Sequence, residues 1–388
     1  MGARLPRRYP SNRPLHARFR LTSMAAGAAS ALLAYLLTRF PAAAELYAGA
    51  IAPVVVGGLS RLSGLVPFAI AEWVLVAFVL RQLIGASRGL AQVVRGRRAA
   101  GNAAAAGALR LGSDLGIVLT LFYVLWGFHY ARAPLEQRLG WIDGPGPTAA
   151  ELSTLTEEMI AAANDAYLEL HGVVDLGAPT LMPEDPSELE RSIDEAWRKI
   201  PAEIGMRRIA DRKYGRAKRP LTSRALCYLG IEGYFSPFTG EANLNAFTPA
   251  VSLPHSMAHE KAHQRGFAPE DEANFMGYLV AAAADDPLAR YAASVFAQRQ
   301  LLGALRDLDA NGYARLVDGR IPGVRRDIEA EREFWVSYYG PGTRAARRAN
   351  DLYLKSNRVE GGIRSYGMSL RLLLQYSRER GGTLTDER

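Results

Sequence analysis

The second half of the chain contains the stretch LPHSMAHEKAHQRG, which runs from Leu253 to Gly266. Within it, His259, Glu260 and His263 form the pattern His-Glu-x-x-His. Side chains four positions apart lie on one face of a helix, so the two imidazoles can bind one zinc ion at about 2.0–2.1 Å each. Glu260 lies beside them around the helix, where it can act on a metal-bound water. These residues predict a Zn2+ site with Glu260 as its catalytic base, and the alternative is a solvated helix face with a fortuitous histidine pair.

A third zinc ligand has to come from another element. Gly266 is typical of a helix end, and Pro269 fits the start of a further helix. That helix would begin with three acids, Glu270, Asp271 and Glu272. We expect Glu272 to be the third ligand, because it lies deepest in the helix and precedes a face that leans apolar. Glu270 is the alternative, although acids in a first turn often serve only the helix dipole.

His255 lies four residues before His259 and continues the histidine stripe. Eight residues of helix span about 12 Å, so one straight helix cannot bring three imidazoles to one ion. We therefore expect His255 at the rim of the site rather than on the metal. Ligands are usually oriented by a second layer of hydrogen bonds, for which Asn274 and Glu241 are candidates.

The net charge of +8 is distributed unevenly along the 388 residues. Residues 1–131 contain 14 Lys and Arg but three acids, a balance of +11, which leaves about −3 for the remainder. The remainder therefore offers no basic surface of the kind that binds nucleic acid. Cys227 is the one cysteine, which excludes an internal disulfide framework and a multi-cysteine zinc ribbon.

The N-terminal third has the composition of a membrane domain. Residues 1–20 carry six arginines and no acid, which predicts a basic cytoplasmic tail. Three apolar runs follow within residues 21–132, and we predict membrane spans at about 21–38, 62–80 and 108–128. The first run also resembles a cleavable signal peptide, because Ala42-Ala43-Ala44 follows it. We favour a retained span.

Arginines predict the orientation of these spans. The connection between the second and third runs contains six of them and no acid: Arg81, Arg88, Arg95, Arg97, Arg98 and Arg110. Lys and Arg are enriched in cytoplasmic loops, so this connection and the N-terminus should both lie inside. The domain that we assign to residues 133–388 would then lie on the outer side of the cytoplasmic membrane. Glu72 and Asp114 interrupt the apolar runs. Rather than an ion path, we expect Asp114 to lie on the same face as Arg110 near the inner interface, and Glu72 to be neutral or hydrogen-bonded to a neighbouring helix.

The rest of the chain reads as a helical domain with a small β component. Thr148 or Ser153 could cap a helix that ends near Leu170, and further helices are predicted at 187–199, 288–307, 325–337 and 343–357. Residues 224–230 are predicted to form a strand. The segment 241–247 could be an extended edge that pairs with a substrate strand, or an ordinary loop.

Several motifs together resemble a bacterial family of membrane-anchored, zincin-like proteins, domain-of-unknown-function family 3810. The matching segments are Trp126-Gly127-x-x-Tyr130-x-Arg132-x-Pro134-Leu135, residues 237–243, Leu253-Pro254, residues 259–267, residues 270–275, Tyr353-Leu354-Lys355-x-Asn357 and Ser365-Tyr366-Gly367. The chain departs from the pattern at His129, where asparagine is expected, and at His255. The resemblance implies three spans followed by a zincin-like α+β domain of mainly helical structure, but no assigned substrate.

The sequence thus predicts a gluzincin-like zinc metallopeptidase that acts on peptide or protein substrates at the membrane surface. Tyr366 could donate a hydrogen bond to the oxyanion, although a buried structural tyrosine is the commoner role. The alternative is a membrane-anchored binding or assembly protein with a structural or vestigial zinc site, in which His255 would supply a fourth ligand. Three spans with few polar residues make a transporter unattractive.

Overall fold

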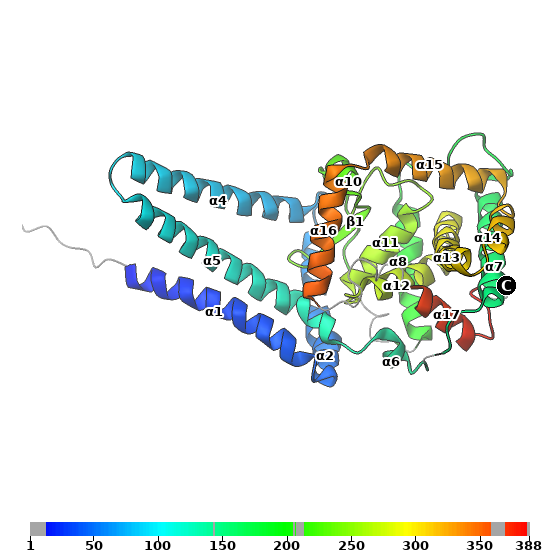
Figure 1. The fold of residues 1–388 in the computed structure, drawn as a ribbon, viewed down its shortest axis with the longest axis horizontal. Coiled ribbons are helices and arrows are strands. Elements are labelled where there is room, and N and C mark those ends of the chain that lie inside the picture. Colours follow the sequence, from blue (N-terminus) through cyan, green and yellow to red (C-terminus); the bar gives the residue numbers. More distant parts are fainter. Residues whose placement is uncertain (1–12, 143, 205, 207–212, 358–368, 386–388) are drawn as a thin grey trace, which may run out of the picture.

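The computed structural model describes residues 13–385 except 143, 205, 207–212 and 358–368. Its described part has a group of long helices and a globular helical domain at one end of that group (Figure 1). Three helices extend away from the domain: α1 (Arg13–Leu37), α4 (Ile70–Val94) and α5 (Ala100–Leu125). A further helical segment joins α1 to α4 at the end of the group that adjoins the domain. It consists of α2 (Pro41–Leu46), a π-helical turn η1 (Tyr47–Ile51) and α3 (Ala52–Ser63).

Four segments of the described chain are long and apolar enough to cross a membrane, whereas we predicted three. They are Ala17–Leu37, Pro41–Ser63, Ile70–Val94 and Ala100–Leu125. The predicted second span, 62–80, was wrong in its bounds, because it joined the end of α3 to the start of α4. Residues 64–69 between those helices are not helical, and Pro67 disfavours a helix in the residue before it. The stretch 41–61, which contains Pro41, Pro53, Gly49, Gly57 and Gly58, was not among the predicted spans.

The acidic residues of the membrane helices are paired locally. Asp114 accepts hydrogen bonds from Arg81 at 3.0 and 2.9 Å and from Gln82 at 2.8 Å. Glu72, in the first turn of α4, accepts from the backbone N–H groups of Leu221 and Thr222, both at 2.8 Å. Glu72 thus ties α4 to the globular domain rather than to a neighbouring membrane helix, and Asp114 ties α5 to α4.

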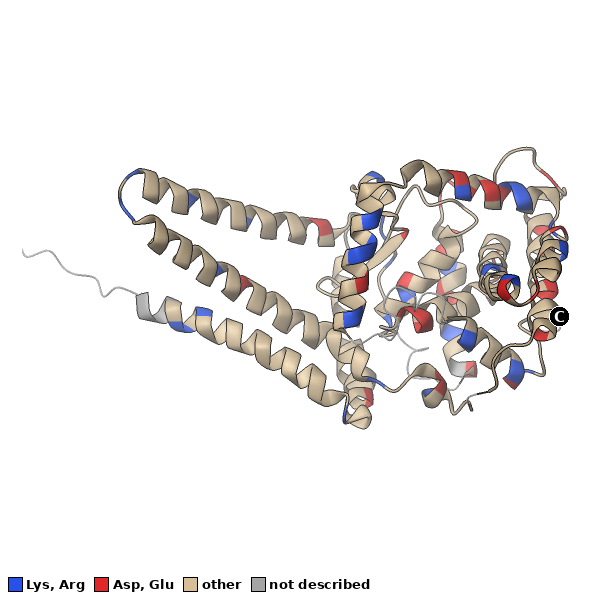
Figure 2. Ribbon diagram, in the orientation of Figure 1, with Lys and Arg blue, Asp and Glu red and all other residues tan. Residues whose placement is uncertain are grey.

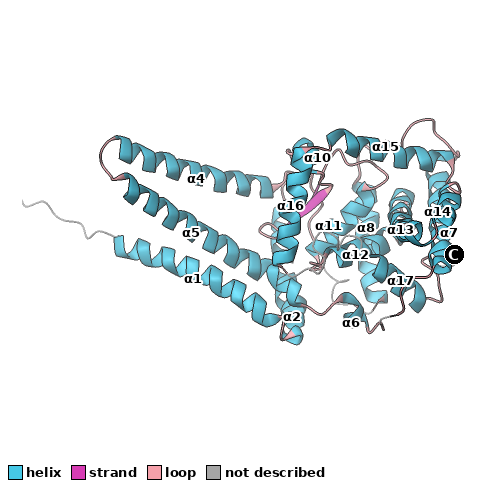
Figure 3. Cartoon of the chain, in the orientation of Figure 1, coloured by secondary structure: helices cyan, strands magenta, loops and turns pink. Residues whose placement is uncertain are grey.

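The globular domain consists mainly of helices, with one two-stranded sheet among its described residues (Figure 3). A 3₁₀ turn, η2 (Gly127–Ala131), and α6 (Leu135–Leu139) lead into it from the membrane. The described helices that follow are α7 (Ala149–His171), α8 (Ser187–Glu203), α10 (Ser223–Leu229), α11 (Leu253–Gln264), α12 (Glu270–Ala282), α13 (Pro287–Leu308), α14 (Ala310–Val317), α15 (Pro322–Tyr338), α16 (Pro341–Ser356) and α17 (Ser369–Glu379). The strands β1 (Gly233–Ser236) and β2 (Glu241–Leu244) pair antiparallel, with Gly233 opposite Leu244. The described chain is therefore mainly helical with a small β component, as predicted.

The core lies between α7, α8, α11, α12, α13 and α17. Its largest fully buried side chains include Trp197, Tyr167, Tyr278, Tyr291 and Phe275. Burial of such side chains is the main favourable term in folding. Both α11 and α12 are buried along nearly their whole length, so the histidine motif is held by the core rather than displayed on a surface helix.

Two local predictions had opposite outcomes. Thr148 caps α7 as predicted, because its hydroxyl oxygen accepts a hydrogen bond from the backbone N–H of Glu151. Residues 224–230 do not form the predicted strand and instead lie in α10 and its end. Gly230 ends this helix in the left-handed conformation with φ +69°, which glycine adopts at little cost.

Candidate metal centre

The two histidines of the motif face the start of the next helix. His259 and His263 lie one turn apart on α11, with ring centroids 4.6 Å apart. The chain reverses after α11 through Gly266, whose φ is +88°. This reversal lays α12 against α11, and Gly277 of α12 lies so close that an added Cβ would be 3.1 Å from the backbone nitrogen of His259. The close packing fixes the first turn of α12 opposite the imidazoles.

Glu270 is the acid that the structure brings to the histidines. Its Oε2 lies 3.3 Å from Nε2 of His259 and 3.5 Å from Nε2 of His263. Ligand atoms of these three residues lie within 4.8 Å of one another, and all three residues are buried. Two imidazoles and one carboxylate with this spacing are the protein ligands of many catalytic zinc sites.

The hydrogen-bond pattern fits a cation between these groups. Nδ1 of His263 lies 2.7 Å from the backbone oxygen of Phe267. A carbonyl can only accept, so Nδ1 carries the proton and a neutral His263 presents the lone pair of Nε2 to Glu270. Among the described residues, no donor with good geometry reaches the buried Oε2 of Glu270. A carboxylate that faces the Nε2 lone pair of His263 needs either a proton or a metal ion between the two groups.

The electrostatics of the three side chains also favour a positive charge between them. Burial opposes a charge on His263, but the carboxylate of Glu270 outweighs it and raises the pKa of His263 to about 9. Burial likewise opposes the charge of Glu270, yet the neighbouring histidines lower its pKa. For His259, burial prevails and lowers the pKa. Glu270 thus attracts positive charge to the site, and a divalent metal ion supplies such charge without requiring protonated imidazoles.

Glu272, the predicted third ligand, points elsewhere. Its carboxylate pairs with Arg138 of α6, and the two side chains are 6% and 7% exposed. Residues two apart on a helix do not share a face, so Glu270 and Glu272 serve different neighbours. Asp271 is buried too, and burial followed by the charge of Glu272 raises its pKa to about 6. The structure thus places Glu270, the alternative, beside the histidines, and Glu272, which we preferred, beside Arg138.

His255 is held away from the centre. Its ring stacks on Phe296 with centroids 3.8 Å apart, and its Nε2 lies 3.2 Å from the backbone oxygen of Asn274. The carbonyl can only accept a hydrogen bond, so Nε2 carries a proton and is not available to a metal. Burial, followed by the charge of His259, lowers the pKa of His255 to about 3. It lines the rim, as expected.

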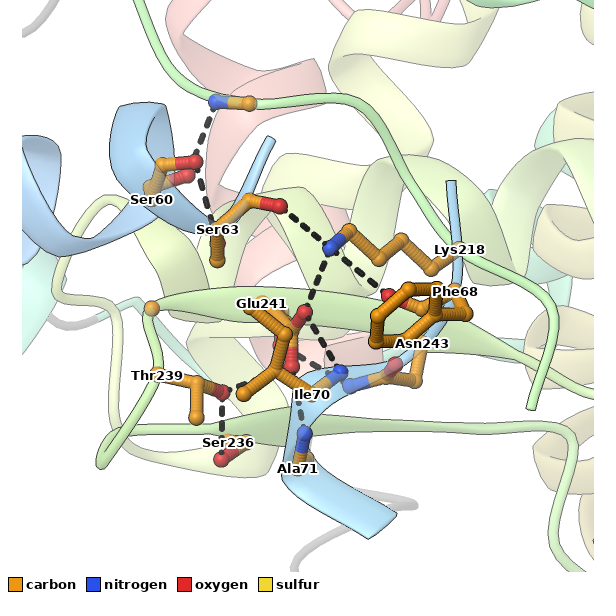
Figure 4. Close-up of polar contacts among 12 residues, drawn as sticks. Ser60, Ser63, Phe68, Ile70, Ala71, Lys218, Ser236, Thr239, Glu241 and Asn243 are labelled. Atoms are coloured by element: carbon orange, nitrogen blue, oxygen red, sulfur yellow. Dashed lines mark hydrogen bonds and ion pairs between the residues drawn. The ribbon is translucent and has the colours of Figure 1, made fainter. Parts of the chain in front are cut away.

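The two suggested orienting residues have different positions. The side chain of Asn274 lies by His259 and favours the protonated imidazole. Glu241 instead accepts hydrogen bonds from Lys218 at 2.6 Å and from the backbone of Ile70 and Ala71 at 3.0 and 2.8 Å (Figure 4). Glu241 therefore joins β2 to the start of α4 and takes no part in the metal centre.

Glu260 lies between the centre and β1. An added Cβ at Gly233 would be 2.8 Å from Cγ and 2.9 Å from Oε1 of Glu260. The strand can pass so close because this position is glycine. Burial raises the pKa of Glu260 to about 8, and among the described residues its buried Oε2 has no hydrogen-bond partner. The result is a carboxyl group that is held in place from one side and is unusually basic.

The metal centre opens into a cavity of about 920 Å³. One wall is β1, and the others come from the end of α5, α11, α13 and α16. Its lining includes aromatic side chains near the metal centre, such as Trp126 and Tyr353, and the cationic side chains Arg299 and Arg347. A cavity of this size accepts a peptide-sized ligand next to Glu260.

The predicted extended edge is occupied on both sides. β2 pairs with β1 on one side, and on the other its Ala242 oxygen and Leu244 N–H bond to the backbone of Lys218 at 2.9 and 2.7 Å. β1, which lines the cavity, is the strand of this sheet that has one paired neighbour among the described residues. An edge for a substrate strand would thus be β1 rather than 241–247.

Sequence reasoning missed the residues that hold the turn between α11 and α12. Arg132 donates to the backbone oxygen of Gly266 at 3.1 Å and pairs with Glu45 through two bonds of 2.9 Å. His129 packs on the same turn, where an added Cβ at Gly266 would be 2.7 Å from its ring. Burial, followed by the charge of Arg132, lowers the pKa of His129 to about 3.

Trp126 connects the same segment to the metal centre. Its ring meets His263 edge to face at 5.5 Å, and its Nε1 donates to the hydroxyl of Tyr353 at 3.1 Å. That hydroxyl lies 3.1 Å from the hydroxyl of Tyr130. The segment 126–135 therefore supports both the histidine helix and the turn after it. Trp126, Tyr130 and Arg132 are part of the family motif, which was the available signal for this role. Tyr366, the predicted oxyanion donor, lies outside the described residues.

Comparison with protein families identifies the chain. Residues 47–374 match the family described as "Protein of unknown function (DUF3810)". The chain belongs to the DUF3810 family. The match includes the segments 126–135, 237–243, 259–267 and 270–275, on which the resemblance was based. Searches of curated proteins and of solved structures found no match.

Proposed function

We propose that this DUF3810 protein is a zinc-dependent peptidase whose domain has a zincin-like, gluzincin-type centre. The observation that supports the proposal is the buried cluster of His259, His263 and Glu270, with the basic carboxyl of Glu260 beside it and a large cavity in front. His259 and His263 would hold zinc through Nε2, and Glu270 through a carboxylate oxygen. Zinc so bound supplies a Lewis acid that polarises a carbonyl and lowers the pKa of water to about 7.

Glu260 is the proposed general base. A water molecule in the cavity loses its proton to Glu260 as it attacks the peptide carbonyl. The same carboxyl then delivers that proton to the leaving amine. Its position beside the two histidines favours this task, because a general base must lie within hydrogen-bond reach of the proton that it takes. The contact with Gly233 limits the positions that the carboxyl can occupy.

The substrate is proposed to be an extended peptide at the membrane surface. β1 offers a strand edge along the cavity, and backbone pairing with such an edge is a general mode of peptide binding. The aromatic side chains near the metal centre would pack against the peptide. Arg347 of α16 is a cationic side chain of the lining and would favour negatively charged groups of the peptide, whereas Arg299 is paired with Glu331.

We further propose that the domain lies on the outer side of the cytoplasmic membrane. The basic turn between α4 and α5 and the start of α1 both lie at the end of the helices remote from the domain (Figure 2). Basic segments remain inside, which supports an outer position for the domain. The alternative function, a binding protein with a structural four-ligand zinc, lacks support from His255, because its Nε2 is engaged by Asn274.

Glu260→Gln tests the proposed chemistry. The purified full chain in lipid vesicles would be incubated with a peptide library, and cleavage would be read by mass spectrometry with zinc content measured on the same samples. We expect the wild type to cleave, and Glu260→Gln to retain zinc while its cleavage falls by at least about 100-fold. His255→Ala is a matched control that should retain zinc. Equal cleavage by Glu260→Gln and wild type would reject Glu260 as the base.

A further inference from the structure

The apolar segment Pro41–Ser63 connects α1 to α4 beside the globular domain. By length and composition it could cross a membrane, yet both of its ends contact the globular domain. Near its start, Glu45 pairs with Arg132 at 2.9 Å. Near its end, Ser60 Oγ accepts from the backbone N–H of Gly215 at 2.8 Å and from Gln264 at 2.9 Å. A spanning helix cannot reach one domain from both faces of a bilayer.

The contacts along the segment are too close to be incidental. Its buried side chains recur at four-residue steps: Ala44, Ala48, Ala52, Val56 and Ser60. An added Cβ at Gly240 would be 2.7 Å from the backbone nitrogen of Ser60, and one at Gly215 would be 2.2 Å from its backbone oxygen. The domain backbone therefore rests directly on the small-residue face of this helix.

The residues after the segment fix its far end as well. The ammonium of Lys218 donates to the backbone oxygens of Ser63 and Phe68 at 2.5 and 2.9 Å and to Glu241 at 2.6 Å. Figure 4 shows how these bonds gather the end of α3, the start of α4 and β2 around one buried lysine. The turn 64–69 is thus held at the domain, where α4 begins.

The opposite face of the segment is apolar and open. Its exposed large apolar side chains are Leu46, Ile51, Val54, Val55 and Leu62, with exposed fractions between 42% and 67%. The exposed charge of the segment, Arg61, lies near its end and donates to the backbone oxygen of Lys213 at 3.2 Å. Such a face is unfavourable in water and is continuous with the helices α1 and α4 at its two ends. The apolar face of an interfacial helix is buried at the boundary of headgroups and acyl chains, and here the globular domain, in place of a polar face, covers the other side.

The distribution of charge favours the same placement. The start of α1 and the turn with Arg95, Arg97 and Arg98 lie at one end of the helix group (Figure 2). If Pro41–Ser63 crossed the membrane, these two basic ends would lie on opposite sides, against the tendency of basic segments to remain in the cytoplasm. If it does not cross, both lie on one side and the domain lies on the other.

We propose that Pro41–Ser63 is an interfacial helix that lies between the globular domain and the lipid surface and does not cross the bilayer. The chain then has three crossings, α1, α4 and α5, and the lipid headgroup region is the partner of the exposed apolar face. Phe122 of the last crossing and Trp126 directly after it also line the cavity, so the cavity is held next to the bilayer. This inference does not depend on the proposed peptidase activity.

Cysteine labelling from one side of the membrane tests the number of crossings. Arg39→Cys lies before the segment, Leu65→Cys after it, and Arg97→Cys in the turn between α4 and α5. All three positions are exposed, and the native Cys227 is buried, so the wild type serves as the blank. Right-side-out and inverted vesicles would be treated with an impermeant maleimide, with labelling in detergent as the total.

An interfacial helix predicts that Arg39→Cys and Leu65→Cys react from the same side and Arg97→Cys from the other. Any pattern in which positions 39 and 65 lie on opposite sides overturns the proposal. Spin labels give a second reading, since their depth follows from oxygen against nickel accessibility. Leu46→Cys, Val54→Cys and Leu62→Cys should have one shallow depth, whereas Trp73→Cys, Leu83→Cys and Val94→Cys on α4 should show a deep middle position. A deep Val54→Cys would contradict the interfacial placement.

Discussion

Replacing Glu270 should weaken zinc binding, whereas replacing Glu272 should lower the stability of the fold. The two acids are two residues apart on α12, but Glu270 faces the histidines and Glu272 faces Arg138. Glu270→Ala removes a proposed ligand. We expect zinc affinity to fall by more than about 100-fold, beyond the roughly 10–100-fold loss that follows removal of a group behind a ligand. Glu272→Ala should leave zinc affinity nearly unchanged.

Glu272→Ala should instead lower the free energy of unfolding. The Arg138 and Glu272 side chains are nearly fully buried, and removing one partner of a buried ion pair costs about 3–5 kcal/mol. Arg138 retains a bond to the backbone oxygen of Ala133 at 2.9 Å and lies 3.8 Å from Glu45. These contacts partly compensate, so we expect about 3 kcal/mol. At about 2–4 °C per kcal/mol for a domain of this size, the melting temperature should fall by about 6–12 °C.

Thermal unfolding of the detergent-solubilised full chain, with and without zinc, measures both effects. A ligand at 100 times its Kd adds about 2.7 kcal/mol of stability, so zinc should raise the melting temperature of wild type and of Glu272→Ala by similar amounts. Glu270→Ala should lose this increase. The reasoning is refuted if Glu272→Ala loses the zinc-dependent increase while Glu270→Ala keeps it.

Two further predictions follow from contacts around the histidine helix. Gly233→Ala should displace Glu260, because the added Cβ would lie 2.8 Å from its Cγ. Cleavage should fall at least about 10-fold with zinc retained. Gly303→Ala is the matched control, because an added Cβ there meets nothing within 4 Å. Unchanged cleavage by Gly233→Ala would show that the position of Glu260 is not critical. The pH dependence of stability should include Asp194: burial opposes its charge, but Lys261 and Arg265 lower its pKa. A lowered folded-state pKa gives stability that is present above the unfolded value of about 3.9 and is lost as the pH falls through the folded value. The free energy of urea unfolding of the metal-free protein between pH 2.5 and 6 should therefore depend less on pH in Asp194→Asn than in wild type. Identical pH profiles would show that the ion pairs of Asp194 do not contribute to stability.

The sequence was sufficient for the local parts of the centre. The spacing of His259 and His263 requires one helix face, and Gly266 with Pro269 indicated the reversal into a second helix. Those signals are local, since caps, turns and periodicity depend on residues a few positions apart. They limited the third ligand to the start of α12, and the structure brings Glu270 to that position.

The choice between Glu270 and Glu272 depends on contacts that no local pattern reveals. Arg138, which takes Glu272, lies 134 residues earlier in the chain. The membrane segment poses the same difficulty, because its composition suits a span as well as a surface helix. Its orientation depends on Ser60, whose partner Gln264 lies 204 residues away. Lys218 and Arg132 were missed for the same reason.

X-ray absorption at the zinc edge of the purified full chain, loaded with one equivalent of zinc, tests the central claim most directly. The account predicts four light ligands at about 2.0–2.1 Å, with scattering from two imidazoles and two oxygens, and the same shell in Glu260→Gln. Two oxygens are expected because Glu270 supplies one and solvent the other. A sulfur neighbour, a third imidazole, or failure to retain zinc at this site would contradict the account.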